Sequence, residues 1–186
     1  MSASIENIEQ VLWRKAGSRS VWMILDGARD RRIYSDLMNS HLVYSCLYSG
    51  TLPYEIEVAA PYLVQLEQGD KSTRDLIERA WGQAWGVFLR TDIRMDRLRR
   101  HLRTMLLVRT WRGERLIFRY YDPRVLRVYL PTCTQEELKT VFGPIEQFHT
   151  EGEVTDILQT FDFTRGKFTR SEVDIRAAVT LQAPEH

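Results

Sequence analysis

The fold is decided by eleven consecutive residues, Leu116-Ile117-Phe118-Arg119-Tyr120-Tyr121-Asp122-Pro123-Arg124-Val125-Leu126. Residues 116–121 alternate aliphatic, aromatic and basic side chains, which is typical of a strand with one buried face. Asp122 can then cap a helix with its carboxylate, and Pro123 suits the first helical turn, where a backbone N–H has no helical partner. The stretch therefore predicts a strand end, a sharp turn and a helix start.

Three charged residues of this stretch, Arg119, Asp122 and Arg124, fall at the carboxyl end of the expected strand. In α/β sheets this edge commonly carries the functional groups. Two interpretations stay open. The residues form a structural corner with a buried Arg–Asp ion pair, or they form an edge that binds a partner.

The composition is that of a soluble globular protein, with 44% hydrophobic and 27% charged residues in a chain of 186. This length allows one core, or one domain with a small appendage. The polar, acidic start MSASIENIEQ does not resemble an export signal, and runs such as residues 21–25 are too short to cross a bilayer. Cys46 and Cys133 have neither the number nor the spacing of a disulfide framework or zinc site. We expect a cytoplasmic protein.

The net charge of +1 hides a strong asymmetry along the chain. Residues 90–127 contain 12 arginines and four acids, giving +8, so the rest carries −7. Of the 26 basic residues 22 are arginines. The guanidinium fork suits carboxylates, phosphates and aromatic faces, so this preference favours specific pairing, although a genomic base bias would produce it too.

Hydrophobic periodicity and capping signals predict alternating helices and strands. The expected helices are 4–15, 33–39, one from 72, 93–106, 123–130 and one from 134 to 142; the expected strands are 21–25, 44–48, 62–66, 85–89, 107–111 and 115–121. Capping boxes are expected at Ser72 with Asp75 and at Thr134 with Glu137. A tight hairpin turn is expected at 112–114.

These elements predict an α/β fold, a mixed sheet flanked by helices on both faces with a small, mainly helical C-terminal lobe. The expected division is an α/β adaptor lobe at 1–130 and a small lobe with a tail at 131–186. Residues 157–163 fit a helix or a strand, and those beyond 176 resemble a loose end.

The sequence lacks the patterns of common enzymes, such as G-x-S-x-G, a phosphate-binding loop or H-E-x-x-H. The histidines are scattered, without a second ligand at metal spacing: His41, His101, His149 and His186. His101 lies among arginines on the expected helix 93–106, which disfavours its protonated form, and a solvent-facing position is expected. Asp26 follows a buried strand, but Gly27 beside it indicates a turn, and Cys46 fits a small buried residue. We therefore predict no catalysis, no cofactor and no metal.

The arginine-rich block also suggests a nucleic-acid-binding module, because its aromatic residues could stack on bases. Several of these aromatics alternate within an expected strand and fit a core better, and the isoelectric point near 7.8 is not strongly basic. Nucleic acid remains the alternative partner. The basic face could equally meet the chain's own acidic surface or an acidic segment of a partner.

A series of short motifs resembles the DUF4123 family, the adaptor chaperones of the bacterial type VI secretion system. The motifs occur in order over about residues 20–147: Ile24-Leu25-Asp26-Gly27-Ala28, Tyr48-Ser49-Gly50-Thr51, Ala60-Pro61-Tyr62-Leu63-Val64, Trp85-Gly86-Val87, His101-Leu102-Arg103, Phe118-Arg119-Tyr120-Tyr121-Asp122-Pro123-Arg124 and Phe142-Gly143-Pro144. The resemblance implies a cytoplasmic, non-catalytic protein that loads a toxin effector onto the VgrG spike and contacts the effector, the C-terminal region of the spike, or both.

An adaptor of this kind needs apolar anchors with a charged rim. We expect a partner-binding surface near Arg119, Tyr121, Asp122 and Arg124. A second, electrostatic patch is expected on the helix 93–106: Arg97, Arg100 and Arg103. The tryptophans Trp81, Trp85 and Trp111 are expected to pack in the interior, and no membrane contact is expected.

Overall fold

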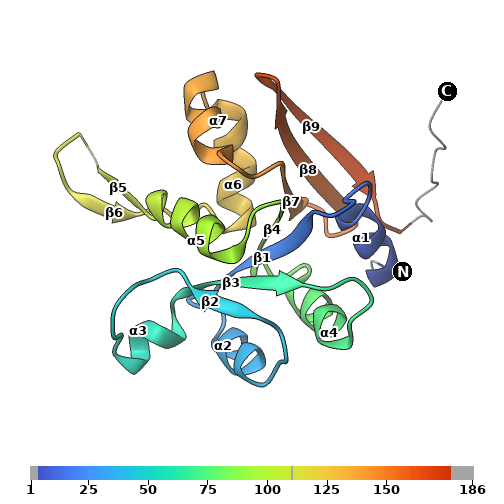
Figure 1. The fold of residues 1–186 in the computed structure, drawn as a ribbon, viewed down its shortest axis with the longest axis horizontal. Coiled ribbons are helices and arrows are strands. Elements are labelled where there is room, and N and C mark those ends of the chain that lie inside the picture. The colour runs from blue at the N-terminus through green and yellow to red at the C-terminus, as the bar shows by residue number, and fades with distance from the viewer. Residues whose placement is uncertain (1–3, 110, 177–186) are drawn as a thin grey trace.

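The computed structural model describes residues 4–109 and 111–176, and in this part of the chain helices cover both faces of a seven-stranded sheet (Figure 1). The strand order is β2-β3-β1-β4-β7-β8-β9, and β5 and β6 form a separate two-stranded sheet. The strands are β1 Ser20–Asp26, β2 Tyr44–Cys46, β3 Pro61–Leu66, β4 Gly86–Thr91, β5 Leu107–Arg109, β6 Arg115–Ile117, β7 Gln147–Glu151, β8 Ile157–Thr164 and β9 Lys167–Asp174. The helices are α1 Ile5–Leu12, α2 Arg31–Met38, α3 Tyr54–Val58, α4 Lys71–Ala80, α5 Met95–Thr104, α6 Pro123–Tyr129 and α7 Gln135–Phe142, with a 3₁₀ turn at Leu130–Thr132.

The central strand β1 is buried on both faces, as its continuous apolar run predicts. Successive side chains of a strand point to opposite faces of the sheet. Val21, Met23 and Leu25 pack with α1, α2 and α4, whereas Trp22 and Ile24 pack with α5, α6 and α7. The predicted α/β class is therefore confirmed, with one hydrophobic cluster on each side of the sheet.

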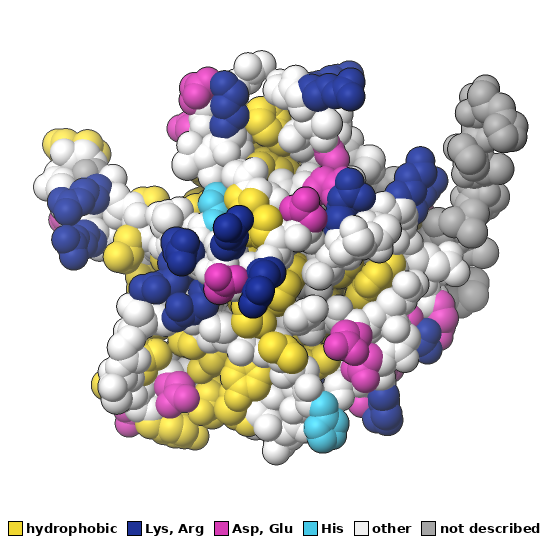
Figure 2. Space-filling view, in the orientation of Figure 1, with side chains coloured by type: hydrophobic (Ala, Val, Ile, Leu, Met, Phe, Trp, Pro, Cys, Tyr) yellow, Lys and Arg dark blue, Asp and Glu magenta, His cyan; other side chains and the backbone are white. Residues whose placement is uncertain are grey.

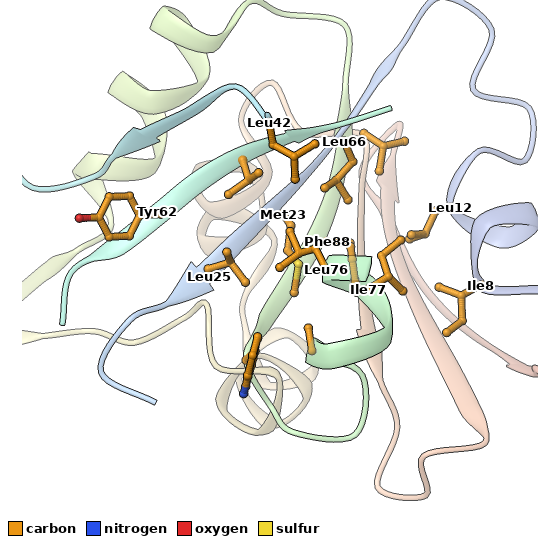
Figure 3. Packing of buried hydrophobic residues seen from close by; sticks show 14 of the residues in the cluster. Ile8, Leu12, Met23, Leu25, Leu42, Tyr62, Leu66, Leu76, Ile77 and Phe88 are labelled. Carbon is orange, nitrogen blue, oxygen red and sulfur yellow. The ribbon is translucent and has the colours of Figure 1, made fainter. Parts of the chain in front are cut away.

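Figure 3 shows the first of these clusters. Ile8 and Leu12 of α1 and Leu76 and Ile77 of α4 lie against the sheet residues around Met23. Each of these five side chains is at most 4% exposed. Burying one aliphatic side chain of this kind contributes about 1.5–3 kcal/mol, so the amphipathic helices depend on the sheet for their stability.

The expectation of a mixed sheet was wrong in one respect, because all strand pairs within the described residues are antiparallel. β3 and β4 run in the same direction and α4 connects them, but β1 lies between them and pairs with both. Alternation of helices and strands along the sequence indicates a crossover. It does not show that a third strand occupies the gap.

The expectation of a mainly helical C-terminal lobe was also wrong. Of the described residues after 131, only α7 is an α-helix, and β7, β8 and β9 extend the central sheet through the pairing of β4 with β7. Residues 157–163, which fitted a helix or a strand, are part of β8. Pairing with β7 and β9 decides the conformation here, because the local pattern does not. The division at residue 130 stays a prediction.

The caps of α4 and α7 show how far local signals reach. Thr134 and Glu137 form the predicted reciprocal capping box of α7. In α4, by contrast, the cap is Asp70, whose carboxylate accepts a hydrogen bond from the backbone N–H of Thr73 at 2.8 Å, and not the predicted Ser72. A single earlier carboxylate thus outcompetes the Ser72–Asp75 pair.

No helix in the described residues is long and apolar enough to cross a bilayer.

Candidate functional site

Strands β5 (Leu107–Arg109) and β6 (Arg115–Ile117) pair as a hairpin, with residues 111–114 before β6, and this hairpin projects from the body of the protein (Figure 1). We call this hairpin the arm. Residues 116–121 were expected to form a strand with one buried face, but β6 covers only Arg115–Ile117 and all three residues are exposed. Burial begins at Tyr120, where the chain re-enters the body. The alternation of apolar and basic residues predicts a strand. It does not show whether one face of that strand packs against a core.

The predicted helix start is confirmed. The carboxylate of Asp122 accepts a hydrogen bond from the backbone N–H of Arg124 at 2.9 Å, and Pro123 occupies the first turn of α6. The guanidinium of Arg124 also donates to both carboxylate oxygens, at 3.0 and 2.6 Å. Burial acts to raise the pKa of Asp122, but the hydrogen bonds from Arg124 outweigh it and hold the pKa below its usual value. Asp122 is 4% exposed and thus stabilises a corner of the fold.

Arg119 pairs with a residue far away in the sequence. Its guanidinium forms an ion pair and hydrogen bond with the carboxylate of Asp26, at the end of β1. Asp26 is 1% exposed and also accepts a hydrogen bond from the backbone N–H of Ala28 at 3.2 Å, which confirms the turn that Gly27 predicts. Burial raises the pKa of Asp26, while Arg119 opposes the shift. The corner was expected to hold a buried Arg–Asp pair of its own, but Arg119 pairs with an acid outside the corner, and its side chain is 43% exposed. This pair fastens the base of the arm to the central strand.

Tyr121, which was expected near a partner-binding surface, lies inside the protein. It is 2% exposed, and its ring meets the ring of Tyr120 edge-on, with 5.4 Å between centroids. Burial raises the pKa of Tyr121 and that of Tyr48 nearby. The Tyr120 hydroxyl donates to the backbone carbonyl of Leu102 at 2.9 Å. Both tyrosines therefore stabilise the junction between the arm and α5.

The three arginines that were expected to form a second patch lie on α5. We call Arg97, Arg100 and Arg103 the α5 arginines; all three are exposed, opposite the buried Leu98 and Leu102. Arg100 and Arg103 line an open pocket of about 600 Å³. Figure 2 shows Lys and Arg side chains gathered on this part of the surface. Among the described residues none forms an ion pair with an α5 arginine.

Two other polar residues of α5 turn inward. Arg99 donates to the backbone carbonyls of Cys46 at 2.7 Å and Tyr48 at 2.8 Å, so it holds the loop after β2 against the helix. His101 lies within 3.0 Å of the Val141 carbonyl at the end of α7, which corrects its expected solvent-facing position. Burial, rather than the neighbouring arginines, lowers the pKa of His101. Polar side chains on a helix can thus be half-buried when that face of the helix packs against other elements.

Sequence reasoning missed the apolar surface of the arm. Its exposed side chains are Leu107 at 58%, Val108 at 40%, Trp111 at 88%, Leu116 at 51% and Ile117 at 54%. Trp111 was expected to pack in the interior; instead it is exposed, and the guanidinium of Arg112 lies 4.6 Å from its ring centroid. Trp85 is buried and Trp81 is half-buried, as expected. Apolar residues occur beside arginines along β5 and β6 in the sequence. The same pattern occurs in strands that pack on a core, so it does not show that the apolar residues are exposed.

An apolar pocket of about 310 Å³ lies where the arm meets the body. Leu107 and Ile117 line it from the arm, Leu106 and Arg103 from the end of α5, and the loop after β2 closes the other side. The residues contributed by that loop are Leu47, Tyr48, Ser49 and Leu52. Apolar walls with an arginine at the edge suit an amphipathic ligand.

The remaining candidate residues do not converge. His149 is buried in β7, and His186 lies outside the described residues. Cys46 and Cys133 are half-buried free thiols, and burial raises the pKa of both. Within residues 4–109 and 111–176, no group of three His, Cys, Asp or Glu side chains is arranged to hold a metal ion.

The model of one protein family matches residues 21–140, which is more than half of the chain. The family is described as a domain of unknown function, DUF4123, and the chain belongs to it. The match includes β1, α5, the arm and α6. Neither a curated protein nor a solved structure matches the chain.

Proposed function

We propose that this protein is a non-catalytic adaptor chaperone of a bacterial type VI secretion system. It binds a toxin effector in the cytoplasm and loads it onto the VgrG spike. The proposal rests on membership of the DUF4123 family and on the ordered motifs that resemble such adaptors. The exposed apolar arm is the structural observation that carries it.

The arm exposes five large apolar side chains on a short hairpin, with Leu107 and Ile117 paired on one face and Val108 and Leu116 paired on the other. Monomeric proteins rarely leave such a group in water, because burying apolar surface is favourable and exposed patches cause aggregation. A patch of this kind commonly marks a protein-binding surface. The arginines around it supply the polar rim that such interfaces use.

The base of the arm is firmly held. Arg119 pairs with Asp26, the backbone N–H of Phe118 donates to the Leu106 carbonyl at 2.9 Å, and Tyr120 is fully buried. Holding a binding element in place before the partner arrives lowers the entropy cost of association. The Asp26 carboxylate is already committed to Arg119 and to the turn at Ala28, which supports a structural and not a catalytic role for this acid.

The proposal is tested with purified effector and spike proteins encoded beside this chain. The assay is size-exclusion chromatography of the three components, with affinities measured by titration calorimetry. We expect a ternary complex with the wild-type chain and a loss of affinity of roughly thirtyfold for Trp111→Ser, the loss typical of an interface tryptophan.

Val154→Ser is the matched control, because Val154 is 60% exposed but lies in the loop between β7 and β8, away from the arm. This variant should bind like the wild type. If the effector binds the spike equally well without the chain, or if the chain binds neither protein, the proposed function is wrong.

A further inference from the structure

The arm contains a pair of like charges that folding alone does not explain. Arg109 of β5 and Arg115 of β6 lie directly opposite each other, and Leu107 and Ile117 form the next pair on the same face. Like charges at directly opposed positions destabilise a two-stranded sheet. Neither arginine forms an ion pair with any residue that the structure describes. An anion placed between them would remove the repulsion.

The apolar pair on this face leads directly to the pocket at the base of the arm. Leu107 and Ile117 line that pocket, and its volume of about 310 Å³ suits one bulky side chain. Arg103 lines the pocket as well. One continuous face therefore offers an apolar cavity and, two residues further out along each strand, two guanidinium groups without an ion-pair partner among the described residues.

We propose that this face binds an extended acidic segment of a partner protein, with a bulky apolar residue in the pocket and an Asp or Glu two residues away between Arg109 and Arg115. The inference rests on the proposed function, because the partner is one of the proteins that the adaptor brings together. Residues i and i+2 of an extended chain share a face and lie about 6.6–7 Å apart, which matches the step from Leu107 to Arg109. A carboxylate there forms charge-assisted hydrogen bonds with either guanidinium.

The chemistry of the pocket favours a protein segment over a nucleic acid. Phosphates would satisfy the arginines, but single-stranded nucleic acids are held by bases stacked on aromatic side chains. Most side chains that line this pocket from the arm, α5 and the loop are aliphatic. An aliphatic wall instead accepts an apolar anchor residue, as in many protein interfaces.

The first experiment uses two dye-labelled peptides of identical composition and charge and the full chain in low salt, read by fluorescence anisotropy. In the in-register peptide, Ser-Glu-Thr-Phe-Thr-Glu-Ser, both glutamates share a face with the phenylalanine in either chain direction. In the shifted peptide, Ser-Thr-Glu-Phe-Glu-Thr-Ser, they lie on the opposite face. We expect the in-register peptide to bind at least about tenfold more tightly, since it alone makes the charge-assisted contacts.

The second experiment separates binding from folding. Arg109→Glu places opposite charges across the arm, so its thermal midpoint should equal or exceed that of the wild type, while affinity for the in-register peptide falls at least about tenfold. Arg165→Glu is the matched control, because Arg165 is exposed in the turn between β8 and β9. This control should bind the peptide normally.

Equal affinity for the two peptides would overturn the inference. Unchanged binding by Arg109→Glu would do the same, as would a short oligothymidylate that binds this face more tightly than the in-register peptide. If the peptide results fail but the effector and spike still assemble on Arg109→Glu, only this inference is wrong. If the peptides behave as expected but no effector–spike complex forms on the wild type, the site stands and the proposed adaptor function fails.

Discussion

His149 provides a quantitative test of the packing around β7. Its side chain is 1% exposed, its Nδ1 lies 2.9 Å from the Thr160 hydroxyl, and its Nε2 has no hydrogen-bond partner among the described residues. Burial, with a smaller contribution from the charge of Arg90, lowers the pKa of His149 from 6.5 to about 3. The folded state thus holds this histidine neutral, while the unfolded state binds a proton below about pH 6.5.

Stability from His149 is therefore fully present above pH 6.5 and is lost progressively as the pH falls from 6.5 towards about 3. At pH 5 the loss is about 2 kcal/mol, since about one and a half pKa units at about 1.4 kcal/mol each separate this pH from the unfolded pKa. His149→Gln should remove this part of the pH dependence. The assay is urea unfolding followed by tryptophan fluorescence at neutral pH and at pH 5, which compares the pH-dependent change for each variant.

Carboxylates also make the free energy of unfolding depend on pH, but the wild type and His149→Gln share them. Their contribution therefore cancels when the pH-dependent changes of the two proteins are compared. His41→Gln, at an exposed position, should keep the wild-type slope. If His149→Gln loses as much stability as the wild type between neutral pH and pH 5, His149 is not held neutral in the fold.

Four further substitutions test other parts of the structure. Asp122→Ala should lower the free energy of unfolding by about 1 kcal/mol through loss of the α6 cap, and an unaltered melting temperature would show that this carboxylate is not a cap. Gly143→Ala should lower the free energy of unfolding by about 2 kcal/mol, measured in thermal or urea unfolding. The reasons are that φ is +48° at this residue and that the added methyl group would lie 2.4 Å from a ring carbon of His101. A variant as stable as the wild type would refute this close approach. Asp26→Ala should cost about 1–2 kcal/mol in urea unfolding, because the backbone N–H of Ala28 and the partly exposed guanidinium of Arg119 both lose their acceptor, and no change would mean that the pair does not fasten the arm. Replacing the α5 arginines together with alanine should weaken partner binding in titrations at low salt and leave the melting temperature almost unchanged, whereas full binding at low salt would exclude this patch.

Local signals in the sequence were sufficient where neighbouring residues decide the structure. Asp122 caps α6 because its carboxylate reaches the backbone N–H of Arg124, two residues along the chain. The capping box at Thr134 is equally local. The apolar run of β1 identified the central strand because burial on both faces leaves no polar position.

Long-range pairing was beyond these signals. Arg119 and Asp26 are 93 positions apart, and only the folded sheet brings them together. The same limit explains why β7, β8 and β9 were missed as extensions of the central sheet, and why β1 was not expected between β3 and β4. The strand order depends on which strands pair with each other. Hydrophobic periodicity predicts a strand but does not identify the strand that it pairs with.

The proposed binding role gives a reason for the composition of the arm that folding alone does not give. Leu116 and Ile117 are each about half exposed and contribute little buried area, and the opposed Arg109 and Arg115 destabilise the hairpin that carries them. Polar residues at these positions would allow the same turn and the same ladder. The residues that do fix the arm, such as Arg119 and Tyr120, lie at its base and belong to the body. Under the proposed function, folding and recognition depend on different side chains, so substitutions along the arm should change affinity without lowering stability, and substitutions at its base should lower both.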